Sequence, residues 1–323
     1  MSPKMRIVFL ETDTLGNDVD LTSFDDLGEV IKYPCSNPSE NADRIAEADV
    51  IIVNKVPMNE MTLAKANHLK LISITGTGTN IVDFKYTNSR NIAVANVKGY
   101  STQSVIQHTF ALFFYVYEKL NYYDQFVKSG DYIRCDVFSH FVMKFHELSG
   151  KTWGIIGLGE IGRGVAEVAK LFGCKVIYYS TGGKNNNTDY VQVDLDSLLR
   201  ESDVISIHAP LNSATMDLIG EEEFAKMKKS AVLLNLGRGP IVNENALAKA
   251  LKEDVIAAAG LDVISVEPML PENPLYEIKD STKLIITPHI AWATIEARQR
   301  VTDEVYKNIE AFQKGEVRNV VRQ

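Results

Sequence analysis

The chain has 323 residues, of which 45% are hydrophobic and 24% are charged. This composition is ordinary for a globular protein of about two domains, and it excludes a disordered or fibrous chain. The formal net charge of -8 gives no overall basic footprint, so we expect neither nucleic acid nor a membrane as a partner. The 3 cysteines are widely spaced and form no C-x-x-C pair, which predicts no metal site, no disulfide framework and a cytoplasmic location.

The first part of the chain, residues 5–95, alternates short apolar runs with polar stretches that are compatible with helices. The apolar runs cover residues 6–10, 29–33, 49–53, 69–74 and 91–96. Strands and helices that alternate at this spacing predict a small α/β domain with a parallel sheet.

Residues 101–130 predict one long helix, which ends at Gly130. Its apolar positions surround most of the helix, so we expect burial on several sides. Its most apolar part, residues 109–116, falls well short of the ~18 apolar residues that a membrane-spanning helix needs.

A second alternation begins at Lys151 and has stronger strands. They cover residues 152–157, 175–180, 204–209, 231–236, 257–263 and 283–288. Nearly continuous apolar strands indicate a parallel sheet covered on both faces, and this number of strands is typical of a doubly wound Rossmann domain that binds a dinucleotide.

The last helical stretch is charged and amphipathic, and we expect it to return to the first domain. The predicted fold is therefore α/β with two doubly wound parallel sheets. A Rossmann domain, residues 101–295, is inserted into a flavodoxin-like substrate domain made of residues 1–100 and 296–323.

A glycine motif follows the first strand of the second alternation. Gly157, Gly159 and Gly162 form the spacing G-x-G-x-x-G, directly after an apolar strand and at the start of a helix. Gly157 would allow a tight turn, Gly159 a close approach of a pyrophosphate, and Gly162 close packing of helix on strand. The amides of Gly159, Glu160 and Ile161 would then face the anionic oxygens of a dinucleotide.

The residue that usually selects NAD is absent. In this motif an acidic residue closes the next strand and binds the ribose, but here the strand ends at Ser180, followed by Thr181 and Lys184 in the next loop. Without a carboxylate there is no repulsion of a 2′-phosphate. Ser180 could equally bind the ribose hydroxyls of NAD, so NAD and NADP both remain open.

Three later strands are each followed by a charged or titratable side chain, namely Arg238, Glu267 and His289. Ligands of open parallel sheets bind outside the carboxyl ends of the strands, so these groups should converge on one crevice. Arg238 could bind a substrate carboxylate, and His289 could exchange a proton with the carbonyl oxygen while Glu267 orients the ring. This set predicts hydride transfer between a nicotinamide and a 2-oxo or 2-hydroxy acid.

The chain resembles the D-isomer-specific 2-hydroxyacid dehydrogenase family. The matching stretches are 157–166, 208–220, 233–247, 260–268 and 287–294. The resemblance implies that Arg238 orients the substrate, Glu267 pairs with the histidine and His289 is the acid/base. It further implies a cofactor-binding set and a substrate-binding set. The former adds His208, Ala209, Pro210, Asn235, Leu236, Gly237 and Asp262 to the glycine motif, with Asp262 on the nicotinamide carboxamide. The latter comprises Lys55, Gly76, Thr77, Gly78, Arg238 and Trp292.

Within that family, Asn54-Lys55, residues 99–102 and residues 289–292 are similar to glycerate dehydrogenases, also called hydroxypyruvate reductases. This similarity implies a small acid such as hydroxypyruvate, glycerate or glyoxylate as the substrate, and a homodimer. Two alternatives remain: a corepressor-like scaffold that binds NADH, and a D-lactate-type dehydrogenase of larger 2-oxo acids.

Overall fold

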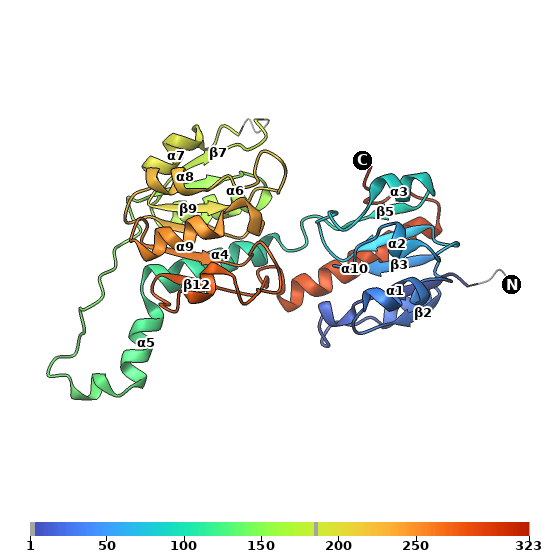
Figure 1. Cartoon of the computed structure of the whole chain (residues 1–323), viewed down its shortest axis with the longest axis horizontal. Helices are drawn as coiled ribbons and strands as arrows, with labels where there is room; N and C mark the ends of the chain where they lie inside the picture. Colours follow the sequence, from blue (N-terminus) through green and yellow to red (C-terminus); the bar gives the residue numbers. More distant parts are fainter. Residues whose placement is uncertain (1–3, 184–186, 323) are drawn as a thin grey trace. The chain divides into compact units, whose positions relative to one another are not determined.

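The computed structural model describes residues 4–183 and 187–322, which form two compact units (Figure 1). Unit 1 comprises Met1–Ser101 and Ala293–Gln323, and unit 2 comprises Thr102–Trp292. Each unit is built around one parallel sheet with helices, which confirms the predicted fold class. Lys184, a candidate for binding a 2′-phosphate, lies outside the described residues.

Unit 1 has a five-stranded sheet in the order β2-β1-β3-β4-β5, in which every pairing is parallel. Its strands are β1 (Arg6–Phe9), β2 (Glu29–Lys32), β3 (Val50–Val53), β4 (Leu71–Ile74) and β5 (Ala93–Ala95). This is the flavodoxin-like strand order, and it places the reversal of winding between β1 and β3. Every residue of β3 and β4 is buried, as their continuous apolar runs predict.

The helices of unit 1 begin at side chains that cap them. They are α1 (Pro38–Arg44), α2 (Glu60–Leu63), α3 (Phe84–Ser89) and α10 (Ile295–Gln313). Their N-caps, Asn37, Asn59, Asp83 and Thr294, each accept a hydrogen bond from a backbone amide of the first turn. The connection from β1 to β2 is not an α-helix but two 3-10 turns, Thr12–Thr14 and Thr22–Asp26, since Gly16 turns the chain between them at φ +83°.

Unit 2 has a seven-stranded parallel sheet in the order β12-β11-β10-β9-β6-β7-β8. Its strands are β6 (Thr152–Ile156), β7 (Lys175–Tyr179), β8 (Val191–Gln192), β9 (Val204–Ile207), β10 (Val232–Asn235), β11 (Ala258–Leu261) and β12 (Leu284–Ile286). The winding reverses between β6 and β9, as in a Rossmann sheet. The carboxyl ends of these two strands therefore border the crevice in which such a sheet binds its ligand.

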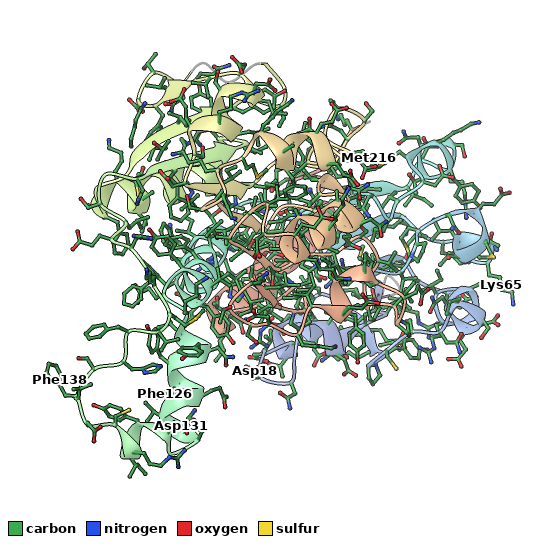
Figure 2. All side chains as sticks on the ribbon, turned by 60° about the vertical axis from the view of Figure 1, so that its left-hand side comes forward. Asp18, Lys65, Phe126, Asp131, Phe138 and Met216 are labelled. Carbon is green, nitrogen blue, oxygen red and sulfur yellow. The ribbon has the colours of Figure 1, made fainter. Side chains whose placement is uncertain are left out.

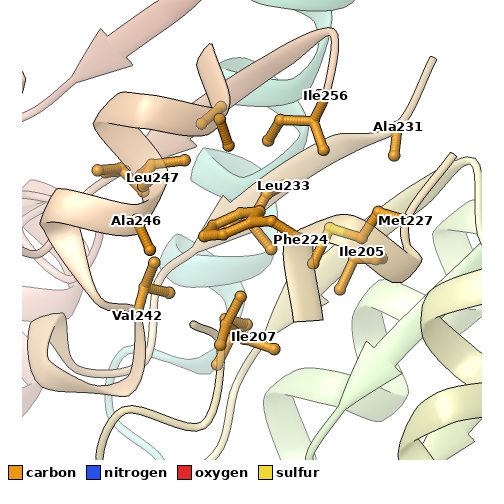
Figure 3. Close-up of a cluster of buried hydrophobic side chains, with 14 of the residues drawn as sticks. Ile205, Ile207, Phe224, Met227, Ala231, Leu233, Val242, Ala246, Leu247 and Ile256 are labelled. Carbon is orange, nitrogen blue, oxygen red and sulfur yellow. The ribbon is translucent and has the colours of Figure 1, made fainter. Parts of the chain in front are cut away.

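Helices cover both faces of this sheet. They are α4 (Thr102–Tyr117), α6 (Glu160–Leu171), α7 (Leu195–Glu201), α8 (Glu221–Lys226) and α9 (Glu244–Lys252), whereas α5 (Leu120–Lys128) lies off the sheet. On one face, Phe224 of α8 packs among Ile205, Leu233 and Leu247 (Figure 3). On the other face, the buried ring of Trp153 packs against Phe110 and Phe113 of α4.

The single helix expected over residues 101–130 is wrong, because α4 ends at Tyr117 and α5 begins at Leu120. Lys119 joins them in the left-handed conformation, with φ +57°. The break falls where the surroundings change: α4 packs against the sheet, whereas α5 has no buried residue. The following segment, residues 129–147, turns at the tip near Asp131 and runs back past Phe138 toward the sheet (Figure 2), where the Tyr117 hydroxyl donates to the carbonyl of Glu147. We call residues 120–147 the arm.

No helix among the described residues has the length and hydropathy required to cross a membrane.

Candidate active site

The glycine motif lies at the point where the sheet of unit 2 reverses its winding, and its 3 glycines have different surroundings. Gly157 has φ +93°, and a Cβ there would lie 2.9 Å from the backbone of Ala209. A Cβ on Gly162 would overlap the carbonyl oxygen of Gly157, so α6 can approach β6 only without that side chain. A Cβ on Gly159, in contrast, would meet no described atom within 4 Å. Gly159 therefore borders open space.

The amino end of α6 adjoins this open space. Gly159 is the N-cap residue, and no side chain caps the helix. The first amides of a helix have no partner inside the helix and favour anionic oxygens. The glycine turn and this helix end therefore fit the pyrophosphate of a dinucleotide, with Gly159, Glu160 and Ile161 nearest to it.

A histidine whose two ring nitrogens are buried borders the same crevice. His208 directly follows β9, and neither of its ring nitrogens has a hydrogen-bond partner among the described residues. Burial lowers the pKa of His208 to about 3, so the ring is neutral at physiological pH. Unpartnered polar atoms of this kind are uncommon in native proteins, and they are consistent with a site that a ligand completes.

The next strand end, at β10, is shaped by an asparagine. The Asn235 Oδ1 atom accepts a hydrogen bond of 3.1 Å from the amide of Gly237, and its Nδ2 donates at 3.0 Å to the carbonyl of Arg238. A Cβ on Gly237 would lie 2.9 Å from the carbonyl oxygen of Ala209. The predicted cofactor-binding segments 208–210 and 235–237 therefore pack against each other at the carboxyl edge of the sheet.

Ser180 and Thr181 follow the end of β7 and are both partly exposed. The two glycines after them, Gly182 and Gly183, border open space. No acidic side chain stands at positions 179–183, as the sequence indicates.

The three candidate catalytic residues follow β10, β11 and β12, which are neighbours in the sheet. The His289 Nδ1 atom lies 2.7 Å from Glu267 Oε2, and both side chains are partly exposed, at 26% and 29%. The pair leaves Nε2 of His289 as the ring nitrogen available to a ligand. Arg238 donates from Nη1 to the carbonyl of Gly237 at 2.8 Å, so its guanidinium folds back on its own turn.

A buried aspartate fixes the backbone around His289. Asp262 is 2% exposed and directly follows β11. Its carboxylate accepts hydrogen bonds from the amides of Ile290 (2.9 Å) and Ala291 (2.8 Å), and its carbonyl accepts the amide of His289 at 2.8 Å. His289 has φ +54°, a conformation that costs a non-glycine residue free energy and that these bonds hold in place.

In unit 1, the loop that carries Lys55 is held by a carboxylate that sequence reasoning did not identify. The Oε2 atom of Glu11 accepts the amides of Asn54, Lys55 and Val56 at 2.9, 2.8 and 3.2 Å. Glu11 lies after β1 and the loop lies after β3, so the contact spans the reversal point of this sheet. The one available signal was an acidic residue directly after the first predicted strand.

The predicted glycine turn Gly76-Thr77-Gly78 follows β4. Thr77 donates its hydroxyl to the carbonyl of Val97 at 2.7 Å, and Asn96 donates its Nδ2 to the carbonyl of Thr77. Both contacts fix the shape of the turn. Trp292, another predicted substrate-binding residue, is the last residue of unit 2.

Comparison with known proteins gives the family. The description "D-isomer specific 2-hydroxyacid dehydrogenase, NAD binding domain" matches residues 110–291. The chain belongs to the D-isomer-specific 2-hydroxyacid dehydrogenase family. The predictions of this family, of an oxidoreductase and of a domain that binds a nicotinamide dinucleotide are confirmed.

Two relatives and one solved structure show which members of the family the chain is similar to. The chain is 37% identical to a glycerate dehydrogenase of Methylorubrum extorquens over 98% of both chains. It is also 37% identical to a hydroxypyruvate reductase of Blautia hydrogenotrophica over 98% of this chain and 99% of the relative. A D-lactate dehydrogenase of Aquifex aeolicus, solved with NAD and lactic acid, superposes with a TM-score of 0.83 at 29% identity and 96% coverage of each chain.

Proposed function

We propose that this dehydrogenase interconverts a small 2-oxo acid and its D-2-hydroxy acid, with hydroxypyruvate/glycerate or glyoxylate as the favoured substrates. The observation that carries the proposal is the 2.7 Å contact of His289 with Glu267 at the same sheet edge as the glycine motif. The names of the two relatives support the choice of substrate, because both concern the glycerate/hydroxypyruvate pair.

His289 is the proposed acid/base. Glu267 accepts a hydrogen bond from Nδ1–H of His289, so Nε2 faces the substrate oxygen, donates a proton to it during reduction and removes one during oxidation. The nicotinamide, when bound, supplies or accepts the hydride. Arg238 would swing from the Gly237 carbonyl to the substrate, where its planar fork suits a carboxylate.

Unit 1 is the proposed substrate domain. Lys55 and the amides of Gly76, Thr77 and Gly78 would bind the substrate carboxylate, and Trp292 would line the pocket. Glu11 supports this assignment because it holds the backbone of the Lys55 loop through 3 hydrogen bonds. A loop that is fixed before the substrate arrives loses less entropy on binding.

Cofactor choice depends on the end of β7 in this proposal. Ser180 and Thr181 present hydroxyls where a carboxylate would repel a 2′-phosphate, so we expect both NAD and NADP to bind. Asp262 would reach the nicotinamide carboxamide with the acceptor capacity that its contacts to Thr287, Ile290 and Ala291 leave.

We also propose a cytoplasmic homodimer. The arm exposes large apolar side chains, among them Ile133 (86%), Phe138 (90%) and Phe141 (82%). Apolar surface concentrated on one projecting segment is typical of an interaction site, and a second copy of the chain would cover it. The free thiols Cys35, Cys135 and Cys174 suit a reducing compartment.

The test is to mix the protein with NADH or NADPH and a panel of 2-oxo acids and to follow the absorbance of the reduced nicotinamide. We expect turnover of hydroxypyruvate or glyoxylate. His289→Ala should abolish most of kcat and leave cofactor affinity unchanged, because the ring acts on the proton and not on the dinucleotide.

Three results would contradict the proposal or a part of it. Turnover of none of the acids, together with capture of protein partners that depends on NADH, would favour a scaffold. A preserved kcat in His289→Ala would remove this histidine as the acid/base. A preference for larger 2-oxo acids would favour the alternative of a D-lactate-type dehydrogenase.

A further inference from the structure

A chain of hydrogen bonds connects the loop that carries His289 to helix α4. The His108 Nε2 atom, on α4, lies 2.9 Å from the Thr287 hydroxyl, and that hydroxyl donates to Asp262 Oδ1 at 2.7 Å. Asp262 in turn accepts the amides of Ile290 and Ala291, the two residues after His289. All of these groups belong to unit 2.

The contacts fix the protonation of His108. Thr287 has one hydroxyl proton, which its 2.7 Å contact assigns to the Asp262 carboxylate. The hydroxyl oxygen can therefore only accept from His108, so Nε2 of that ring carries a hydrogen. Burial lowers the pKa of His108, with Asp262 at 3.6 Å opposing the shift, and the neutral ring with its proton on Nε2 is the form that suits this contact.

The same face of α4 makes a second contact with the loop. Ser104 lies one helical turn before His108, and its hydroxyl donates to the carbonyl of Ala291. Residues that are four apart share a helix face, so Ser104 and His108 hold the two ends of the segment 287–291. His289 lies between the two points of attachment, at φ +54°.

We propose that His108 is a positioning residue for His289, acting through Thr287 and Asp262. This inference rests on the proposed function, in which His289 is the acid/base. His108 touches neither His289 nor Glu267 in any described contact, and nothing in the catalytic chemistry itself requires it. Its role is to hold the Thr287–Asp262 pair, so that the loop keeps the strained backbone that presents the imidazole.

The physical cost of breaking the chain can be estimated. Removing the His108 donor leaves the Thr287 hydroxyl oxygen without one partner and loosens the loop by one hydrogen bond. A loss of this size in the positioning of an acid/base corresponds to a fall in kcat of about tenfold. Binding of the dinucleotide at the glycine motif should be unchanged.

The first experiment compares variants of α4. His108→Leu removes the donor, His108→Gln keeps an amide donor in place of the ring, and Gln107→Leu is the control, because Gln107 is the exposed neighbour on the same helix. We expect kcat to fall about tenfold in His108→Leu with little change in the KM for the cofactor, recovery in His108→Gln and no change in Gln107→Leu.

A second readout does not depend on activity. Hydrogen–deuterium exchange of the intact protein should show faster exchange at the amides of Ile290 and Ala291 in His108→Leu, because these amides donate to Asp262. Thr287→Val should give the same result and Thr287→Ser should not. Even when His108→Leu does not fold, the two Thr287 variants test whether the chain of hydrogen bonds holds the loop.

The outcomes separate the two proposals. Unchanged kcat and unchanged exchange at residues 290 and 291 in both His108→Leu and Thr287→Val would overturn the positioning role. If His289→Ala keeps its kcat, the assigned acid/base fails, whereas the exchange measurement still decides whether His108 holds the loop.

Discussion

His208 gives a quantitative prediction about acid stability. Its ring nitrogens are covered and unpartnered, and burial lowers its pKa to about 3 in the folded chain. In the unfolded chain a histidine titrates near its ordinary value of about 6.5. The unfolded state therefore binds a proton more readily, and folding loses stability as the pH falls from about 6.5 toward 3.

The size of the effect follows from these two pKa values. At about pH 4.5 the unfolded ring is almost fully protonated and the folded ring is almost fully neutral, which costs the folded state about 2.7 kcal/mol. At about pH 7 the same term is only about 0.2 kcal/mol. We therefore predict that His208 alone accounts for a loss of about 2.5 kcal/mol between these pH values.

The assay is urea denaturation of the wild type and of His208→Leu, followed by the fluorescence of Trp153, which is buried in the same unit. The stability of the wild type should fall between about pH 7 and about pH 4.5 by some 2.5 kcal/mol more than that of the variant. His146→Leu, at an exposed position, is the control for removing an imidazole. If the wild type and His208→Leu lose stability in parallel, the imidazole is not kept neutral in the folded chain.

The remaining predictions test the glycine motif, the cofactor preference and the role of Glu11 in holding the Lys55 loop. Gly159→Ala should leave the unfolding free energy nearly unchanged but weaken dinucleotide binding, whereas Gly162→Ala should destabilise unit 2, because its Cβ would overlap the Gly157 carbonyl; equal stability of the two variants in thermal unfolding would contradict this contrast. Ser180→Asp should lower the affinity for NADP more than that for NAD, and an unchanged NADP/NAD ratio in binding titrations would show that position 180 does not face the ribose. Glu11→Ala should raise the KM for the 2-oxo acid at an unchanged cofactor Kd, because the loop of Lys55 loses 3 hydrogen bonds; an unchanged KM would separate this loop from substrate binding.

All strands of the two sheets except β8 could be predicted from the sequence, because burial on both faces of a parallel sheet requires continuous apolar runs, and these runs are visible. The strand β8 was missed because it has two residues, both exposed, and no apolar run. The glycine motif could be predicted for a similar reason, since the backbone at Gly157 and Gly162 tolerates no side chain. The pairing of His289 with Glu267 was predicted from the order of strand ends. In the first two cases one local requirement limits which residues can occupy a few neighbouring positions, and in the third the parallel sheet brings two strand ends together.

The groups that sequence reasoning missed depend on contacts between distant segments. His108 is 179 positions from Thr287, and Glu11 is 43 positions from Asn54. A histidine in an apolar helix and an acid after a strand are both common, so neither residue type is informative by itself. The break at Lys119 was missed for another reason: no Pro or Gly marks it, and only the change from a packed helix to the exposed arm explains it.

In both sheets, residues that stabilise the fold lie at the amino ends of the strands, and the candidate site residues lie at the carboxyl ends. At the amino edge of each, an aspartate just before a central strand accepts a backbone amide and pairs with a lysine. Asp49 does so with Arg6 and Lys70, and Asp203 with Thr152 and Lys228. The candidate site residues instead follow the carboxyl ends of the strands. Asp203→Ala leaves the Thr152 amide unpaired, so it should cost unit 2 about 1–3 kcal/mol of stability without changing kcat, the opposite pattern to that of His108→Leu.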